Sequence, residues 1–335
     1  MKINEDLLDS VFKHFKQMKT KTVMVIGDIM LDHYIRGKVE RISPEAPVPI
    51  VNVTEEVLKL GGAGNVASNL KSLGANVLLS GTVGSDIHSQ SIFGVLYQAG
   101  ISTDWLVTDA DRGTIVKTRV IAHTQQVVRL DRENKTPISF IVRDRIIDAV
   151  SANIDSLDAI IISDYAKGVV SRPLVQRVLG IARNKGIPVC VDPKNGNFPF
   201  YSNVDVITPN IKELSYGSGI EIRSYEDMLE ASKKIRSNLQ CKVLLVTRGD
   251  QGMSLFDFEN EGEPVDIPTT ARHVYDVTGA GDTVIAAFTL AMISGATSRE
   301  AAVIANMAAG IVVGEVGTAS VSLDDLYKAC MGQED

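Results

Sequence analysis

A chain of 335 residues can form one large domain or two, because chains near 300 residues bury roughly three quarters of their unfolded surface. Its apolar fraction of 44% and charged fraction of 22% are ordinary globular values. The net charge of −7 argues against a nucleic-acid-binding surface. An anionic substrate would therefore need a locally basic pocket.

The predicted elements alternate along the chain. Residues 1–21 carry apolar side chains at helical spacing, and short apolar runs without polar alternation then follow, at 22–26, 76–79, 158–162, 188–191, 204–207 and 242–246. Helical patterns lie at 65–73, 88–98, 139–153, 173–185, 224–239, 283–294 and 299–313. The apolar runs indicate strands buried on both faces of a parallel sheet. The alternation predicts an α/β fold with a doubly wound, mostly parallel sheet.

Two segments, at about 34–53 and 114–131, break this alternation. The first contains Pro44, Pro47 and Pro49, which exclude a central strand or a helix. The second reads as a hairpin that turns near residues 123–125. Together they predict a small β-sheet outside the main layer. Such a sheet could form a lid over the carboxyl edge of the main sheet and a place for subunit contact, or it could be an insertion without a role.

Cysteine usage and hydropathy indicate the compartment. Cys190, Cys241 and Cys330 are far apart and form no C-x-x-C pair or zinc-spaced cluster. A reduced, cytoplasmic location fits them best. The acidic residues near the N-terminus exclude a signal peptide, and no stretch approaches the roughly 20 apolar residues needed to span a bilayer. We therefore expect neither a membrane nor a nucleic-acid partner.

The most informative segment is Asp-Val-Thr-Gly-Ala-Gly-Asp at residues 276–282, directly before the apolar helix 283–292. Small residues leave backbone N–H groups uncovered where the positive end of a helix dipole begins, and this favours an anion. A carboxylate there, Asp282, would compete with that anion unless it faces a different group. A phosphate on the N–H groups and a substrate hydroxyl on Asp282 would be the arrangement of a kinase. The alternative is a helix cap preceded by a glycine-rich loop.

A second glycine-rich segment, at residues 61–67, satisfies G-x-G-x-x-A from Gly62, the dinucleotide fingerprint. That fingerprint belongs directly after the first buried strand. Here the first strand ends in Gly27-Asp28, and residues 55–60 look charged and poorly strand-like. The glycines are therefore interpreted as letting a ligand lie close to the backbone, with Asn65 reaching a sugar hydroxyl. A nicotinamide enzyme remains the alternative.

Two further motifs suit a nucleotide and its metal. Asn210 and Glu213 lie three apart at a helix start after the strand 204–207, where an amide and a carboxylate suit hydrated Mg²⁺ or form a capping box. Residues 246–253 form a tight turn with glycines that suits either an ordinary hairpin or a shelf for a nucleotide. The chain has neither a Walker A loop nor the protein-kinase loop set.

Taken together, these motifs resemble the ribokinase-like (PfkB) sugar kinases. DVTGAGD is similar to their C-terminal signature, GGAGNVASNLKSLG to their N-terminal signature, TPNIKE to their N-x-x-E magnesium motif and VTRGDQGM to their nucleotide shelf. The four occur in family order between residues 23 and 316. The resemblance implies one ribokinase-like kinase domain over residues 1–335, with the two β segments as its lid.

A narrower resemblance is to bacterial heptose 7-phosphate kinases of the ADP-heptose pathway, which supplies lipopolysaccharide cores. GDIMLDHYIRGKVERISPEAPVPIV carries it, with SDYAKGVV, VDPK and ANMAAGIVVGEVGTA. Val277 stands where the broad family usually has threonine, and valine occurs in this subgroup. The five histidines include no H-x-G-H pair of a nucleotidyltransferase, so we expect a stand-alone kinase.

The resemblance implies roles for individual residues. Asp282 would accept the proton of the sugar hydroxyl, and its place at a helix N-terminus should keep it ionised. The N–H groups of Gly279, Ala280 and Gly281 would bind the transferred phosphoryl. Mg²⁺ would be ordered by Asn210 and Glu213, and ATP would be lined by Thr247, Gly249, Gly252 and Asn306. The sugar would meet Asp32, Gly62 and Asn65. The substrate's own phosphate would meet cations among Arg41, Arg129, Lys167 and Lys194.

The expected activity is transfer of the γ-phosphate of ATP to the C1 hydroxyl of D-glycero-D-manno-heptose 7-phosphate. Alternatives are a ribokinase-like kinase of another sugar, nucleoside or hexose phosphate, and a catalytically silent sugar-phosphate sensor. The cofactors would be ATP and Mg²⁺, with a monovalent cation left open. Apolar residues between Val48 and Val53 suggest a homodimer formed through the lid.

Overall fold

The computed structural model describes residues 5–331 apart from 124, 261–262, 272–273 and 316, with side chains from residue 12 onward. Its central layer is a nine-stranded sheet in the order β13-β12-β11-β10-β9-β8-β1-β4-β5. The pairs from β5 to β11 are parallel, and β12 and β13 pair antiparallel at one edge. The strands are β1 (Thr22–Gly27), β4 (Asn76–Val83), β5 (Leu106–Thr108), β8 (Ala159–Ser163), β9 (Val189–Asp192), β10 (Val206–Ile207), β11 (Val243–Thr247), β12 (Met253–Asp257) and β13 (Val265–Ile267). The expectation of a doubly wound, mostly parallel sheet is confirmed.

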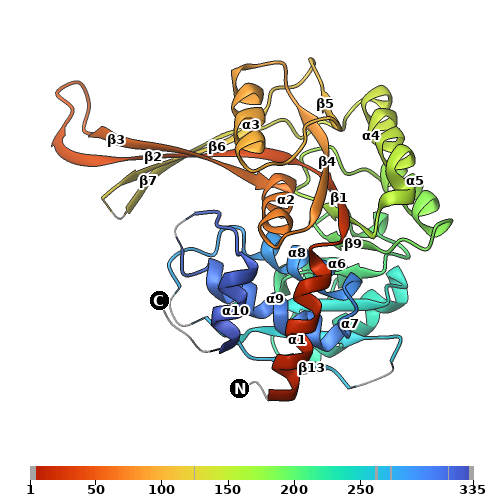
Figure 1. The fold of residues 1–335 in the computed structure, drawn as a ribbon. Coiled ribbons are helices and arrows are strands. Elements are labelled where there is room, and N and C mark those ends of the chain that lie inside the picture. Colours follow the sequence, from red (N-terminus) through yellow and green to blue (C-terminus); the bar gives the residue numbers. More distant parts are fainter. Residues whose placement is uncertain (1–4, 124, 261–262, 272–273, 316, 332–335) are drawn as a thin grey trace.

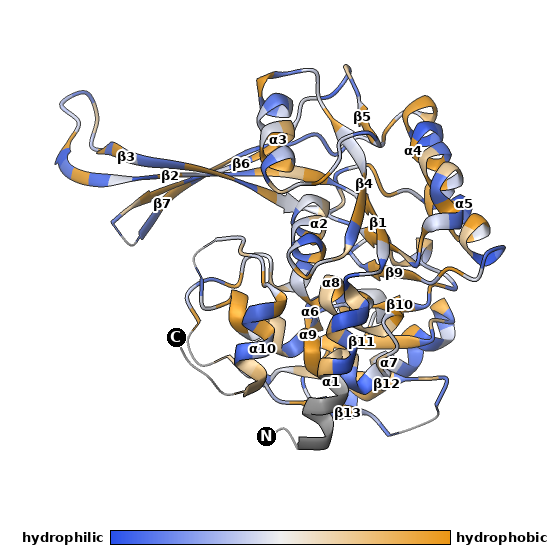
Figure 2. Cartoon of the chain, in the orientation of Figure 1, coloured by the Kyte–Doolittle hydropathy of each residue, from blue (hydrophilic) through white to orange (hydrophobic). Residues whose placement is uncertain are grey.

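Helices cover both faces of this sheet (Figure 1). Alternate residues of β1 show why: Val23 and Val25 face one apolar cluster, and Met24 and Ile26 face the other. The first cluster includes residues from α1 (Glu5–Met18), α2 (Ala63–Ser72), α3 (Ile87–Gln98), α8 (Ala280–Ile293), α9 (Ser298–Val312) and α10 (Leu323–Met331). The second includes residues from α4 (Phe140–Asn153), α5 (Arg172–Arg183), α6 (Ile211–Ser218) and α7 (Tyr225–Leu239). Figure 2 shows the outer helices α4 and α5 with one apolar and one polar side.

A separate four-stranded sheet extends from the body, in the order β3-β2-β6-β7 (Figure 1). Two antiparallel hairpins form it, β2 (Ile29–Ile42) with β3 (Pro49–Gly62) and β6 (Ile115–Ala122) with β7 (Gln125–Arg132). They join through the parallel pair β2–β6. Pro44 and Pro47 lie between β2 and β3, and Pro49 is the first residue of β3, as expected of residues that cannot donate to a ladder. Thr124, in the predicted second turn, lies outside the described residues.

Three sequence expectations differ from the structure. Residues 55–60 belong to β3, contrary to the poorly strand-like reading, because most of this strand is solvent-exposed and tolerates charged side chains. The strand expected at 204–207 is only the two-residue β10. The short helix α10 follows the last predicted helix. Short 3₁₀ helices lie at η1 (Ile154–Ser156), η2 (Phe198–Phe200) and η3 (Gly249–Gln251).

Within the described ranges, no helix combines the length and hydropathy that a bilayer crossing requires.

Candidate active site

The predicted base Asp282 lies with three other acidic residues, which the sequence analysis did not single out, where the parallel strands end. Asp28 follows β1, Asp164 follows β8, Asp192 ends β9 and the N-terminus of α8 carries Asp282. Ligands of open α/β sheets bind at this carboxyl edge. All four side chains are carboxylates, so the site concentrates negative charge close to the start of a helix.

The loop before α8 has the backbone of an anion site. Gly279 is its N-cap with φ 84°, and a Cβ there would lie 2.6 Å from Asn65 Nδ2. Both facts require glycine. The Ala280 N–H donates to the Val277 carbonyl at 3.2 Å, whereas those of Gly279 and Gly281 have no acceptor among the described residues. The expectation that all three N–H groups are available is therefore corrected to Gly279 and Gly281.

Asp282 is 2% exposed and both of its oxygens are held. Asn65 Nδ2 donates to Oδ2 at 2.8 Å, and the Tyr165 hydroxyl donates to Oδ1 at 2.8 Å. Burial raises the pKa of Asp282 to about 7, and these two hydrogen bonds oppose the rise. The expectation that the helix N-terminus keeps this group a weak base is therefore wrong, because desolvation outweighs the favourable contacts. Asn65 orients Asp282 through this hydrogen bond, and its expected contact with a sugar hydroxyl stays a prediction.

Tyr165 was missed by the sequence reading, although SDYAKG directly follows a buried strand. A buried carboxylate, Asp28, shapes its loop by accepting the backbone N–H groups of Tyr165, Lys167 and Val169 at 3.0, 3.0 and 3.1 Å. Burial raises the pKa of Asp28, and these three hydrogen bonds lower it. Gly62, with φ 57°, allows the close approach, since a Cβ there would lie 2.4 Å from the Asp28 carbonyl. Gly62 is thus packed against the residue that holds this loop, and its expected contact with the sugar stays a prediction.

Asp32 lies on β2 and is 3% exposed. Its carboxylate accepts a hydrogen bond from Arg119 on β6, and the Arg119 guanidinium lies 5.2 Å from the centre of the Tyr34 ring. A Cβ at Gly61 would lie 2.3 Å from Asp32 Oδ2. The charge of Asp32 raises the pKa of Asp282, so the two carboxylates are close enough to interact. The role of Asp32 in binding the sugar stays a prediction. Sequence reasoning did not identify Arg119.

Asn210 and Glu213 form a complete capping box at the start of α6. Each side chain accepts the other residue's backbone N–H, at 3.0 and 3.1 Å. Glu213 also pairs with Lys194 Nζ at 2.8 Å. The capping box, which the sequence left open as an alternative, is therefore present. Lys194 lies beside the residues that are expected to hold the metal.

A divalent cation fits this corner nevertheless. Burial and the charges of Asp282 and Glu213 raise the pKa of Asp192 well above its usual range, and Lys194 opposes the rise. Such mutual repulsion marks a local excess of negative charge. No three described Asp, Glu, His or Cys side chains are arranged as direct metal ligands. Glu213 and Asp192 would therefore hold Mg²⁺ largely through water, as Mg²⁺ often prefers.

The predicted nucleotide shelf is the turn between β11 and β12. Thr247 ends β11, and its N–H donates to the Pro209 carbonyl at 3.0 Å, which places the shelf beside the Asn210 corner. Gly249 and Gly252 have φ 61° and 84°, and a Cβ at Gly252 would lie 2.1 Å from the Ile267 carbonyl. Asn306 donates to the Pro268 carbonyl at 2.8 Å, so it fixes the segment after β13.

The four cations proposed for the substrate phosphate are dispersed. Arg41 is exposed near the far end of β2, nine residues beyond Asp32, which at about 3.3 Å per strand residue is roughly 30 Å away. Arg129 pairs with Asp131 at 2.9 Å, and Lys167 pairs with Glu133 at 2.6 Å. Within this chain, therefore, the structure does not bring Arg41 and Lys194 together with the other two.

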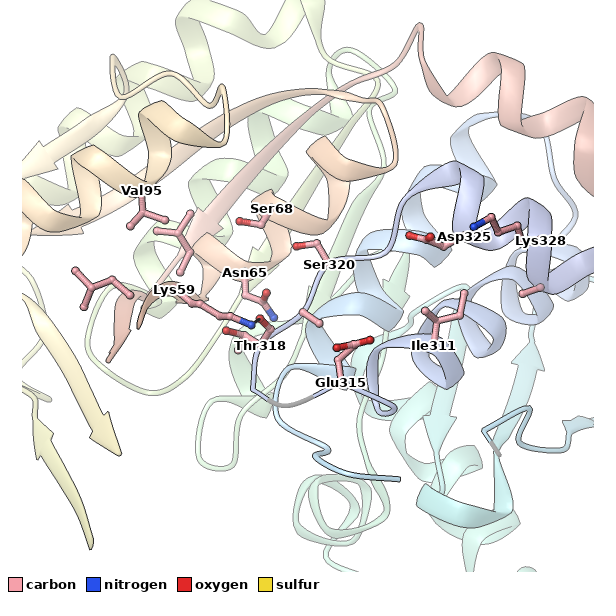
Figure 3. Close-up of a pocket in the computed structure, with 14 residues that line it drawn as sticks. Lys59, Asn65, Ser68, Val95, Ile311, Glu315, Thr318, Ser320, Asp325 and Lys328 are labelled. Carbon is pink, nitrogen blue, oxygen red and sulfur yellow. Dashed lines mark hydrogen bonds between the residues drawn. The ribbon is translucent and has the colours of Figure 1, made fainter. Parts of the chain in front are cut away.

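A cavity of about 690 Å³ borders the anion loop on the side of α2 and α10. Figure 3 shows Lys59, Asn65 and Thr318 close together on its wall, and Lys59 Nζ donates to the Thr318 carbonyl at 2.6 Å. The Thr318 Cγ2 lies 3.3 Å from where a Gly279 Cβ would be. The cavity is therefore adjacent to the anion loop and shares Asn65 with the site.

Comparisons with known proteins agree with this geometry. The chain is 44% identical over 320 residues to a "Bifunctional protein HldE" of Pelobacter propionicus, covering 96% of this chain and 65% of that protein. It is 44% identical to another of Geobacter sulfurreducens, covering 94% and 63%. The chain thus spans less than two thirds of the length of these relatives.

Solved structures show the same fold. Arabidopsis thaliana ribokinase complexed with ribose and ATP superposes with a TM-score of 0.72 at 20% identity, covering 92% of this chain and 98% of that one. Phosphofructokinase-2 from Escherichia coli gives 0.77 at 20% identity, covering 93% and 99%. The model of the pfkB family carbohydrate kinases matches residues 20–326. With its ribokinase-like fold and its anion loop beside a buried carboxylate, the chain belongs to the pfkB family of carbohydrate kinases.

Proposed function

We propose that this chain is one kinase domain that transfers the γ-phosphate of ATP to the C1 hydroxyl of D-glycero-D-manno-heptose 7-phosphate, giving the 1,7-bisphosphate for ADP-heptose synthesis. The family match supports a carbohydrate acceptor. The sugar phosphate itself is supported by the segments that resemble heptose 7-phosphate kinases, and by the 44% identity to proteins named HldE.

One observation carries the kinase assignment: a buried carboxylate whose pKa is about 7 lies three residues after a glycine N-cap with uncovered N–H groups. A general base works best when its pKa lies near the working pH. Preorganised N–H donors beside it suit a group that gains negative charge in the transition state. Asp282 and the N–H groups of Gly279 and Gly281 lie within one turn of α8. In-line phosphoryl transfer needs the base and the anion-binding groups to be this close together.

The residues divide the work as follows. Asp282 takes the proton of the acceptor hydroxyl, while Asn65 and Tyr165 fix the direction of its lone pairs. The N–H groups of Gly279 and Gly281 face the transferred group. Asp32, oriented by Arg119, accepts hydrogen bonds from the sugar. ATP would supply the phosphoryl group. Glu213 and Asp192 would hold Mg²⁺ beside its phosphates, and the metal would supply charge neutralisation there.

A panel of acceptors in a coupled ADP-release assay tests the proposal. Heptose 7-phosphate should give the highest kcat/KM, and ribose, adenosine and fructose 6-phosphate should give much lower values. Asp282→Asn enzyme should bind ATP yet turn over orders of magnitude more slowly. Efficient use of ribose or adenosine without use of heptose phosphate would overturn the substrate assignment.

We also propose a homodimer that forms through the small sheet. Strand register places Leu58, His33, Thr118 and Leu130 in one row, on the face opposite to Asp32. Leu58, Leu130 and Val128 are 37%, 54% and 43% exposed, and Val48 and Val53 add 51% and 53%. Such apolar exposure supports burial against a second copy. Light scattering of Leu130→Glu protein should show monomers; an unchanged mass would contradict this interface.

We further propose that the enzyme works in the cytoplasm, because its three cysteines are free and buried, which suits a reducing compartment.

A further inference from the structure

One face of the small sheet is lined with charged side chains. Strand register places Lys59, Asp32, Lys117 and Asp131 in a row across β3, β2, β6 and β7. Residues directly opposite each other on neighbouring strands point to the same side. The next row on this face contains Arg119 and Arg129. Lys59 on this face donates to the Thr318 carbonyl at 2.6 Å, and the hydroxyl of Tyr34, two residues beyond Asp32, accepts the Thr318 N–H at 3.3 Å. Thr318 lies against Gly279, so this face looks onto the anion loop.

Most cations around this face already have partners. Arg119 donates to Asp32, and Arg129 holds Asp131 through two hydrogen bonds of 2.9 and 3.0 Å. Lys167 Nζ lies 2.6 Å from Glu133 Oε2, and Lys59 donates to a backbone carbonyl. Lys117 is half-buried, yet its side chain has neither a hydrogen bond nor an ion pair in the part of the chain that the structure describes.

An unpaired cation in a half-buried position is unfavourable without a counter-charge. Burial lowers the pKa of Lys117, Asp131 opposes that change, and the neighbouring charges of Lys167 and Arg129 lower the pKa further. The contacts agree with this, since Lys117 lies opposite Asp131 in the strand register and Lys167 pairs with Glu133, two residues further along the chain. A dianionic group placed between the two lysines would relieve the repulsion and supply Lys117 with the partner it lacks.

We propose that Lys117, together with Lys167, binds the non-reacting phosphate of the sugar phosphate and thereby selects phosphorylated over neutral sugars. This inference rests on the proposed function and gives its phosphate a location. It replaces Arg41 and Lys194 in that role. Lys167 belongs to the loop that carries Tyr165, so a phosphate bound there also touches the segment that orients Asp282.

The test compares wild-type, Lys117→Met and Lys117→Arg enzymes in the ADP-release assay, with heptose 7-phosphate and unphosphorylated heptose as acceptors. Lys117→Met should raise KM for heptose 7-phosphate at least tenfold, leave KM for ATP within twofold, and leave kcat/KM for unphosphorylated heptose unchanged. Lys117→Arg, which keeps the charge, should recover most of the affinity. Lys38→Met, an exposed lysine change on β2 of the same sheet, should behave as wild type.

Two outcomes separate the possible failures. A wild-type enzyme that prefers heptose 7-phosphate, with the same preference in Lys117→Met, would overturn the role of Lys117 and leave the proposed function standing. A wild-type enzyme that uses only unphosphorylated acceptors would overturn both. If Lys117→Met does not fold, the Lys117→Arg enzyme and a Lys167→Met variant decide: unchanged KM for heptose 7-phosphate in Lys167→Met would refute the phosphate site.

Discussion

Replacing Tyr165 with phenylalanine removes one of the two hydrogen bonds on Asp282 and little else. The Tyr165 hydroxyl donates to Oδ1 at 2.8 Å and so favours the ionised carboxylate, whose pKa burial has raised to about 7. A hydrogen bond to a charged group contributes about 1.5–3 kcal/mol. At 1.36 kcal/mol per pH unit, its loss should move the acidic limb of the kcat/KM profile upward by about 1 to 2 pH units.

The assay is kcat/KM for the sugar phosphate between pH 5.5 and 9.5. Tyr165→Phe enzyme should lose roughly tenfold at pH 7 and regain activity at high pH, where Asp282 ionises again. Tyr97→Phe is the control, because its side chain is 85% exposed on α3. A Tyr165→Phe profile that overlays wild type would refute the view that Asp282 is the titrating base.

Three further predictions follow from the same geometry. Gly279→Ala should lower kcat by a hundredfold or more, about 3 kcal/mol, because φ is 84° and the new Cβ would lie 2.6 Å from Asn65. Gly281→Ala is the control and should stay near wild type, because a Cβ there would meet open space. Equal losses of kcat in the two variants would contradict this reading. Asp282→Asn should raise the melting temperature at pH 8 but not near pH 4. The pKa of Asp282 is raised in the folded state, so its contribution to the free energy of unfolding is fully present below the unfolded pKa and falls by on the order of 4 kcal/mol as the pH rises through about 7. A gain in melting temperature that is independent of pH would argue against this reasoning. Glu213→Gln keeps an oxygen that can accept the Asn210 N–H but removes the negative charge. The Mg²⁺ concentration that gives half-maximal rate should therefore rise about tenfold. An unchanged Mg²⁺ concentration would exclude Glu213 from the metal site.

Sequence reading succeeded where the signal was local. Alternating strands and helices, the prolines between β2 and β3, and the glycines around residues 279–281 all follow from backbone chemistry within a few residues. Only residues 55–60 of β3 were not predicted as a strand, because most positions of β3 are exposed or partly buried and need few apolar side chains.

The parts that sequence could not predict depend on contacts between distant segments. Nothing near Asn65 reveals that its amide reaches Asp282, and nothing near Asp282 reveals the burial that raises its pKa. Nothing in the sequence around Lys117 shows that its side chain is unpaired while the neighbouring cations have carboxylate partners. Pairings of this kind are set by the packing of the two sheets and α8, which single motifs do not encode.

The two hydrogen bonds on Asp282 join it to residues 117 and 217 positions away in the chain. Contacts of such long sequence separation form late, since the chain entropy lost in closing large loops must be met first. Enzymatic activity should therefore return last during refolding, after helix content has recovered. Recovery of activity would therefore mark the completion of folding, and a partly folded chain should not transfer phosphate.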